Sequence, residues 1–265
     1  MARVVRINVA PVKSLGLVHP EEIELDARGL AGNRRFWLVD ESRRLVNNKR
    51  RGQLVRIRPE WNEQTRELAL TFPDGTRVAG VVELGPQPFE VEMYGYPLAS
   101  RRVLGPWEDA ISEYAGERLT LLWADEGAPD RLHAGTVTLV SRESLKRLAE
   151  EAGEDDLDGR RFRMLVEIEG VDPHEEDAWQ GTHVRVGDAT IRVNGDVGRC
   201  AVTTHDPDTG VPTVDTLKAL ARYRREGRKE PLPFGVYGSV VVPGRVRVGD
   251  DVQPLQERLI ATSLY

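Results

Sequence analysis

The chain of 265 residues has 40% apolar residues, 30% charged residues and a formal net charge of -6. This composition is typical of a globular protein, and no apolar run approaches the roughly 20 residues needed to span a bilayer, so no membrane anchor is expected. The negative charge argues against sequence-independent binding of nucleic acid, because neutralising phosphates requires clustered basic side chains.

The first residues, MARVVRINVAPVKS, begin directly with an alternating apolar pattern. They contain no long apolar core of the kind found in a signal peptide, which predicts that the protein stays in the cytoplasm. Basic clusters do occur at residues 49–51 and 160–163, and the first is interpreted as solvated surface. The length fits one large domain or two smaller ones of roughly 100 to 150 residues each.

Residues 1–120 are expected to consist mainly of short strands joined by turns, a spacing typical of β-sandwiches and β-barrels. Residues 21–29 alternate apolar side chains with acids, which predicts a strand. Residues 36–48 and 67–80 each contain two apolar runs around a polar turn, which predicts two hairpins. Residues 106–116 begin with proline and end with glycine, which predicts a short helix between the two halves.

Residues 121–265 have a mixed pattern of strands and helices. The two expected helices begin at Ser141, a residue type favoured at N-caps, and near residue 213, and they end at Gly153 and Gly227. Strands are expected at residues 136–141, 160–170, 182–195 and 238–252. Because there is no internal repeat and no low-complexity linker, the two halves are expected to pack closely.

The only cysteine, Cys200, lies in the segment GRCAVTTHDPDTG at residues 198–210. One cysteine cannot form an intramolecular disulfide, a four-thiolate iron–sulfur cluster or a closed cysteine-rich zinc site, which excludes these classes. Two interpretations of Cys200 are open: a small buried apolar residue, which is the commoner case, and a functional thiol. Arg199 favours the second, because a neighbouring cation stabilises the thiolate that attacks electrophiles and binds metals.

A Cys–His pair is not expected within this segment. Five extended residues would separate Cys200 from His205 by about 16 Å and place the two side chains on opposite faces of a strand. The sequence DPDTG lacks the later ligands of a calcium loop, whereas its aspartate, proline and glycine are typical of a tight turn. We therefore expect Cys200 near the end of an extended segment, close to a turn at residues 206–210.

Several segments are similar, in the same order along the chain, to one known family. They are APVKS (10–14), RRFWLVD (34–40), LVSRESL (139–145), RRFRMLVEI (160–168), EEDAW (175–179) and PLPFGVYGSVVVPGRVRVGD (231–250). Together with GRCAVTTHDPDTG they resemble the MOSC domain family, and within it the mitochondrial amidoxime-reducing component and its bacterial relatives. The resemblance extends over nearly the whole chain.

This resemblance implies a mostly β fold with some α-helix: a MOSC N-terminal β-barrel domain at residues 1–120, packed on a MOSC β-barrel domain with peripheral helices at residues 121–265. It also implies a molybdenum–molybdopterin cofactor, the molybdenum cofactor, held between the domains with the thiolate of Cys200 as a soft ligand of the metal. Cations and hydroxyls bind phosphate, and the expected cofactor contacts are Lys13, Ser14, Arg35, Ser141, Arg163 and Arg199.

Structural alternatives remain open for these contacts: a plain N-cap for Ser141, exposed strand positions for the arginines, and a surface position for Lys13. The chain also departs from the family at two places. Arg34 stands where the family typically has aspartate, and Met164 and Leu165 stand where it has proline and asparagine. Leu165 is therefore expected to remove a hydrogen-bonding group from the wall of the cofactor site.

The activity implied by the resemblance is the removal of oxygen from small N-hydroxylated molecules such as amidoximes and hydroxylamines. Electrons are expected from a separate flavin or iron–sulfur protein, because one cysteine excludes an iron–sulfur cluster and no GxGxxG motif follows a strand. Two alternatives remain open. One is a sulfur carrier that uses a Cys200 persulfide in the assembly of metal–sulfur cofactors, and the other is a non-catalytic protein that binds the molybdenum cofactor.

Overall fold

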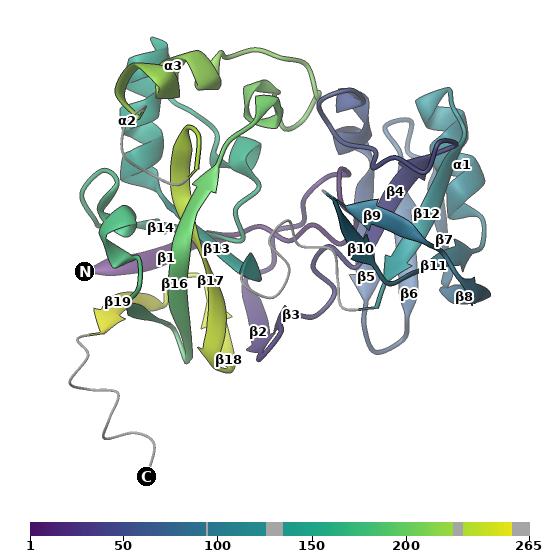
Figure 1. The fold of residues 1–265 in the computed structure, drawn as a ribbon, viewed down its shortest axis with the longest axis horizontal. Helices are drawn as coiled ribbons and strands as arrows, with labels where there is room; N and C mark the ends of the chain where they lie inside the picture. Colours follow the sequence, from purple (N-terminus) through teal and green to yellow (C-terminus); the bar gives the residue numbers. More distant parts are fainter. Residues whose placement is uncertain (94, 126–134, 225–229, 256–265) are drawn as a thin grey trace.

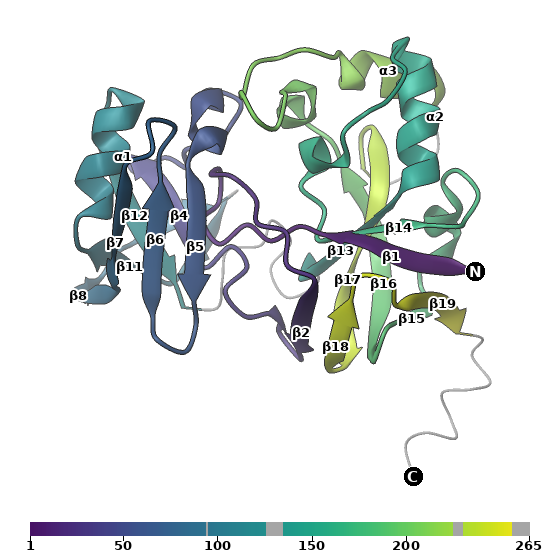
Figure 2. The ribbon, with the colours of Figure 1, turned by 180° about the vertical axis from the view of Figure 1, so that it is seen from behind.

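The structure is a computed structural model that describes residues 1–93, 95–125, 135–224 and 230–255. Two β-rich halves lie side by side, and Figure 1 and Figure 2 show them from opposite sides. The expected mostly β fold with a few helices is confirmed. Within the described residues, no helix has the length and apolar character that crossing a membrane requires.

The helices and strands fall into two groups along the chain. Up to residue 124 they are β1 (Ala2–Ile7), β2 (Glu22–Asp26), β3 (Gly29–Leu30), β4 (Phe36–Asp40), β5 (Arg58–Asn62), β6 (Glu67–Thr71), β7 (Arg77–Val81), β8 (Glu83–Pro88), β9 (Val91–Met93), β10 (Tyr96–Leu98), β11 (Ser100–Leu104), α1 (Trp107–Ala115) and β12 (Leu119–Ala124). After residue 134 they are β13 (Val137–Ser141), α2 (Arg142–Ala152), β14 (Val166–Glu169), β15 (His183–Val186), β16 (Ala189–Gly198), α3 (Thr216–Tyr223), β17 (Pro233–Val242), β18 (Gly244–Arg247) and β19 (Asp251–Leu255).

The second half is built on a closed barrel whose strand order is β1, β14, β13, β17, β16, β15 and β19. β13 and β14 pair in parallel, and the other neighbours pair antiparallel. Buried and exposed residues alternate along β15 and β16, which is the period of two that a strand imposes. Their buried residues, including Val184, Ile191 and Val193, point into the apolar core of the barrel.

The first strand of the chain belongs to this barrel. β1 pairs with β14 on one side and with β19 on the other, and β2 pairs with β18. The chain therefore begins in the second half, enters the first half between β1 and β2, where Val12 bridges to Phe36, and leaves the second half again after β3. Figure 2 shows this path. A domain boundary near residue 120 stays a prediction, and at the level of strand pairing β1 and β2 join the second half.

The first half contains a four-stranded sheet, β4-β12-β11-β8, and a three-stranded sheet, β5-β6-β7, around an apolar core of their own. Among its described strands, the hydrogen bonds form separate sheets and not one closed ring. Trp107 at the start of α1 is buried, and its indole N–H donates to the Leu68 carbonyl over 3.1 Å, which ties this helix to β6. The predicted bounds of α1, Pro106 and Gly116, are confirmed.

Helices α2 and α3 pack against each other at one end of the barrel (Figure 1). Ser141 caps α2 by accepting a hydrogen bond from the Ser144 N–H, and Gly153 ends the helix with a φ of 78°, so both predicted bounds are confirmed. α3 ends at Tyr223. The predicted stop at Gly227 lies outside the described residues.

The predicted hairpins form to different extents. Residues 67–80 form β6 and β7, and residues 182–195 form β15 and β16, so these two predictions are confirmed. Residues 36–48 form only one strand, β4, followed by an isolated bridge between Val39 and Leu45.

The prediction of a strand over residues 160–170 is wrong for the first part of this range. Gly159–Phe162 form a 3-10 helix, η3, and Arg163 adopts a left-handed conformation with a φ of 52°. The strand, β14, begins only at Val166. Part of the reason is tertiary: the guanidinium of Arg199 donates to the Phe162 carbonyl over 3.1 Å, a contact that the local pattern does not encode.

Candidate functional site

A cavity of about 380 Å³ lies between the two halves and includes the only cysteine in its lining. Segments that follow β1 and β4 form one wall, and residues around η3, the end of β16 and β17 form the other. We call this cavity the cysteine pocket, and its principal polar residues are Lys13, Arg34, Lys49, Arg161, Arg163 and Cys200.

Cys200 is exposed to solvent, so its interpretation as a buried apolar residue is wrong. It follows the end of β16 by two residues and precedes a 3-10 helix, η5 (Ala201–Thr204). The Cys200 carbonyl accepts hydrogen bonds from the N–H and the hydroxyl of Thr203, each at 3.1 Å, which fixes the backbone of the cysteine. The predicted location near the end of an extended segment is confirmed.

The predicted turn after the cysteine is also confirmed. One carboxylate oxygen of Asp206 accepts hydrogen bonds from the N–H groups of Asp208 and Thr209, and Gly210 has a φ of 73°. The turn meets the first half at Gly52, where the two backbones lie so close that a Cβ added to either glycine would be 1.9 Å from the carbonyl oxygen of the other. The cysteine segment is therefore held against the first half.

The extended spacing assumed between Cys200 and His205 is wrong, because the residues between them form η5. The imidazole Nδ1 of His205 lies 2.9 Å from the Ala201 carbonyl oxygen and 3.3 Å from the Thr204 hydroxyl. His205 lines a neighbouring cavity and not the cysteine pocket.

Three residues of the cysteine pocket have left-handed backbone conformations. Ser14, Arg34 and Arg163 have φ values of 77°, 53° and 52°. Residues other than glycine rarely adopt this region, because the Cβ atom is crowded, and such strain is concentrated at functional sites. The backbone that surrounds the pocket is thus held in positions that the rest of the fold must stabilise.

Two arginines join the halves across this pocket. Arg34 of the first half donates to the Arg163 carbonyl over 3.3 Å, and Arg163 of the second half donates to the Leu15 carbonyl over 2.8 Å. Each arginine therefore fixes the backbone of the opposite wall. Arg163 was expected from the sequence as a cofactor contact, whereas Arg34 was noted only as a departure from the family.

The electrostatic character of the pocket is opposite to that of the whole chain. Its lining includes six cationic residues, the five named above with Arg199, and no aspartate or glutamate among the described residues. The whole chain carries a formal net charge of -6. A concentration of one charge sign in a cleft creates a local potential that attracts ligands of the opposite sign, so this pocket suits an anion.

Arg199 lines the pocket, but its guanidinium binds the protein itself. It donates to the carbonyl oxygens of Phe234 and Phe162 and to the sulfur of Met164, and it lies over the Phe162 ring. These contacts attach the residue before Cys200 to β17 and to the turn before β14. Arg199 thus positions the cysteine segment.

Lys13 and Ser14 both line the pocket as predicted, and both are mostly buried, so the surface alternative for Lys13 is wrong. The Ser14 hydroxyl donates to the Val46 carbonyl over 2.9 Å, which leaves its oxygen lone pairs as acceptors. Lys49, interpreted from the sequence as solvated surface, is exposed and also lines the pocket.

Arg35 does not lie in the cysteine pocket. Its guanidinium donates to the carbonyl oxygens of Ala124 and Asp125 and lies over the ring of Trp123, so it binds within the first half. Arg34 occupies the pocket wall instead. Arg34 lies in a turn with a left-handed backbone, so the alternation of side chains along a strand could not separate the two arginines in the sequence.

Ser141 lies apart from the pocket as well, in a buried polar cluster beside α2. Its hydroxyl donates to the Glu176 carboxylate over 3.0 Å, and the Ser144 hydroxyl donates to the same carboxylate over 2.8 Å. Burial raises the pKa of Glu176, and these hydrogen bonds partly oppose that effect. The N-cap alternative for Ser141 is confirmed.

Two family models match the chain. The model of the MOSC N-terminal beta barrel domain matches residues 1–105, and the model of the MOSC domain matches residues 129–253. The chain belongs to the MOSC domain family. The first match contains most strands of the first half together with β1 and β2, and the second match contains β13 to β18 of this MOSC protein.

Its similarity to individual relatives is moderate. The MOSC protein is 26% identical over 279 residues to mitochondrial amidoxime-reducing component 1 from Homo sapiens, covering 94% of this chain and 82% of that protein. It is 26% identical over 266 residues to molybdenum cofactor sulfurase 2 from Culex quinquefasciatus, covering 89% of this chain but only 34% of that protein. The chain thus spans about a third of that sulfurase. Among solved structures, the YUAD protein from Bacillus subtilis has a TM-score of 0.44 and 12% identity, covering 96% of this chain and 97% of that one.

The residues of the cysteine pocket fit a cofactor that combines a metal with a phosphate. The thiol is a soft ligand, and the surrounding cations and the amides of Asn47 and Asn48 are donors for phosphate oxygens. Met164 lies in the pocket wall, whereas Leu165 is 2% exposed and packs in the barrel core. Leu165 also lines a small cavity together with Arg34 and Arg163, and its expected effect on the cofactor site stays a prediction.

Proposed function

We propose that this MOSC protein is a molybdenum-cofactor-dependent oxidoreductase that reduces N-hydroxylated compounds, with Cys200 as the protein ligand of the metal. The observation that carries the proposal is the exposed thiol of the only cysteine in a cavity lined by six cationic residues. Similarity to an amidoxime-reducing component and to molybdenum cofactor sulfurases supports the same cofactor.

In this proposal the residues of the chain bind and orient the cofactor. Cys200 binds the metal, Lys13 and Arg163 bind the phosphate, and Arg34 and Arg199 hold the two walls in place. When bound, the molybdenum cofactor supplies the two-electron chemistry that removes oxygen from the substrate. The overall conversion of N–OH to N–H consumes two electrons and two protons and releases water.

The electrons must come from outside the chain. We propose a separate flavin or iron–sulfur protein as the donor, and a cytoplasmic location, as expected from the sequence. An exposed cysteine segment between two walls leaves the small N-oxygenated substrate a route from solvent.

Analysis of the purified protein tests this proposal. Molybdenum and extractable pterin are measured, together with the reduction of benzamidoxime by an artificial electron donor. We expect cofactor and activity in the wild type and the loss of activity in Cys200→Ala. Val211→Ala, which changes the exposed residue directly after this segment, is the matched control and keeps activity. Undiminished benzamidoxime reduction by Cys200→Ala contradicts the proposal.

A sulfur carrier is the second candidate, and the same exposed Cys200 thiol is compatible with it. A persulfide on an accessible thiol can be transferred to an acceptor, because its outer sulfur is open to attack. Metal-free protein that releases cyanide-labile sulfur, lost in Cys200→Ala, supports this function. Bound cofactor without reduction of N-hydroxylated compounds supports a non-catalytic cofactor-binding protein instead.

A further inference from the structure

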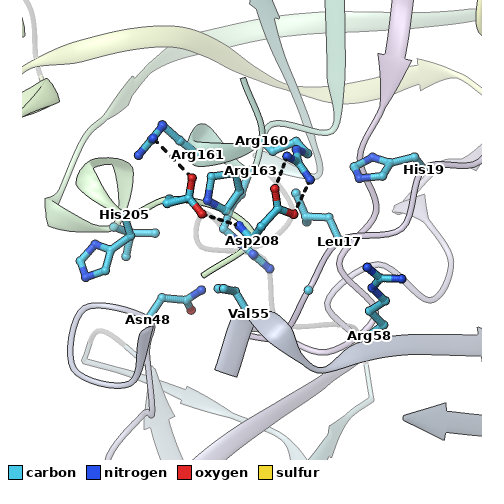
Figure 3. A pocket seen from close by; sticks show the side chains of 14 residues that line it. Leu17, His19, Asn48, Val55, Arg58, Arg160, Arg161, Arg163, His205 and Asp208 are labelled. Atoms are coloured by element: carbon cyan, nitrogen blue, oxygen red, sulfur yellow. Dashed lines mark hydrogen bonds and ion pairs between the residues drawn. The ribbon is translucent and has the colours of Figure 1, made fainter. Parts of the chain in front are cut away.

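A second cavity of about 260 Å³ adjoins the cysteine pocket. The two cavities share four lining residues, Asn48, Arg161, Arg163 and Val202, so they are direct neighbours. We call the second cavity the arginine pocket, and its basic side chains are His19, Arg58, Arg160, Arg161, Arg163 and His205. Figure 3 shows Arg160, Arg161 and Arg163 facing Arg58, Asn48 and Val55 across it.

Two aspartates, Asp206 and Asp208, also line the arginine pocket, so four arginines face two carboxylates. Arg160 donates to both oxygens of Asp208, over 2.8 and 2.7 Å, in the paired geometry that a carboxylate or phosphate ligand adopts. The Asp208 side chain is 65% exposed, and exposed ion pairs contribute little stability. A ligand oxyanion can therefore replace Asp208 at low cost, while Arg160 keeps its second carboxylate partner, Asp158, to which its Nε–H donates over 2.8 Å.

Two further groups in the pocket lack an acceptor. Arg58, the first residue of β5, is exposed, and its side chain makes no hydrogen bond or ion pair in the described part of the chain. The Nε–H of Arg161 is buried and has no hydrogen-bond partner among the described residues, although its other nitrogens bind Thr204 and Thr213. A buried donor without an acceptor is costly, and an added oxygen within reach of this N–H would remove that cost.

His19 lies in the same wall and responds to its charge. Burial lowers the pKa of the His19 imidazole, and the cations of Arg6 and Arg160 lower it further, whereas a hydrogen bond to the Ile7 backbone and the carboxylate of Asp158 raise it. An anion bound in this pocket would raise the pKa of His19, because it would oppose the effect of the two cations.

We propose that the arginine pocket binds the oxyanionic end, a carboxylate or a phosphate, of an N-hydroxylated substrate whose N–O group lies in the adjoining cysteine pocket. This inference rests on the proposed reductase function. It assigns a substrate class, anionic N-hydroxylated molecules, because the two cavities share four lining residues and a single elongated ligand would extend from one into the other.

Three compounds test it: neutral benzamidoxime, its 4-carboxylate and its 4-phosphate ester. Their binding to the purified full chain is measured by calorimetry at low salt, and KM is measured for each. We expect both anions to bind better than benzamidoxime. Arg58→Gln reduces that preference by about three- to fivefold, the upper range for one exposed charge. A preference for only one of the two anions identifies whether the pocket takes carboxylate or phosphate.

Two further variants complete the test. Asp208→Asn removes a competing carboxylate from Arg160, so it increases the preference for the anions. Arg56→Gln changes a nearby exposed arginine that does not line the pocket and serves as the control. In NMR titrations, the 4-carboxylate raises the pKa of His19, whereas neutral benzamidoxime does not.

Equal binding of the neutral and anionic compounds, or equal effects of Arg58→Gln and Arg56→Gln, overturns the inference. So does a loss of molybdenum and pterin from Arg58→Gln, since that result places the cofactor phosphate in the arginine pocket. Failure of the proposed function is distinguishable, because it appears as wild-type protein that binds the anions but reduces none of the three compounds.

Discussion

The contact between Gly52 and Gly210 holds the cysteine segment against the first half, and alanine at either position tests this role. A Cβ at Gly52 would lie 1.9 Å from the Gly210 carbonyl oxygen, whereas ordinary contacts begin at 3.4 Å, so the two backbones must separate by well over an ångström. Crowding of this kind costs about 1 to 3 kcal/mol. Gly210→Ala adds about 1 to 2 kcal/mol, because its φ is 73°.

The free energy of unfolding, measured by urea denaturation, distinguishes the two costs. Gly75→Ala is the matched control, since Gly75 has a φ of 87° but no atom within 4 Å of an added Cβ. We expect Gly52→Ala to be destabilised by crowding alone, Gly75→Ala by conformation alone, and Gly210→Ala by both. The double variant Gly52→Ala/Gly210→Ala should lose less stability than the two single losses together, because one separation relieves both clashes.

The rate at which Cys200 reacts with a thiol reagent supplies the second readout. Because the turn and the cysteine belong to one segment, separation of Gly52 from Gly210 should change that rate, whereas Gly75→Ala should not. Reactivity in Gly52→Ala that equals the wild-type value, together with a stability loss no greater than that of Gly75→Ala, would refute the reasoning.

Three further predictions concern the buried polar groups beside α2 and α3. Glu176→Gln tests the raised pKa of Glu176. The folded state holds the carboxyl proton more tightly than the unfolded chain does, so the free energy of unfolding falls as pH rises above the ordinary pKa of 4.5. Urea denaturation from pH 4 to 8 should show that the free energy of unfolding depends less on pH in the variant. Asp177→Asn leaves Arg224, whose side chain is 11% exposed and lies 2.6 Å from Asp177, without its carboxylate, so it should cost about 3 to 5 kcal/mol. Glu60→Gln in an exposed ion pair is its control and should cost less than about 1 kcal/mol in the same denaturation assay. Ser141→Ala removes an N-cap and a donor to Glu176, so it should cost about 1 to 3 kcal/mol while the molybdenum content measured in the purified protein is unchanged; a loss of molybdenum without a loss of stability would contradict this assignment.

Local signals in the sequence were sufficient for features that depend on a few neighbouring residues. Proline before α1, Ser141 before α2 and glycine after each helix define their bounds, because caps act on the adjacent turn. The turn at residues 206–210 follows from Asp206 and Gly210 for the same reason. These signals also placed Cys200 correctly at the end of a strand.

Features that depend on distant residues were not predictable in this way. The 3-10 helix before Arg163 is stabilised by Arg199, which is more than thirty residues away in the sequence. Arg34 lies in the pocket wall, where Arg35 was expected from the family similarity. Which of the two arginines enters the pocket depends on which side of the chain faces the second half. Burial of Ser141 beneath Glu176 likewise arises from packing between separate segments.

The pairing of β1 with β19 has a consequence for the order in which the protein is made. Ala2 lies opposite Val252, so β1 leaves the ribosome long before its second neighbour has been translated. A ring closed over so long a span has a high entropic cost, which makes its formation a late folding event. One wall of the cysteine pocket is built on that ring. We therefore expect any cofactor to bind after β19 has been synthesised.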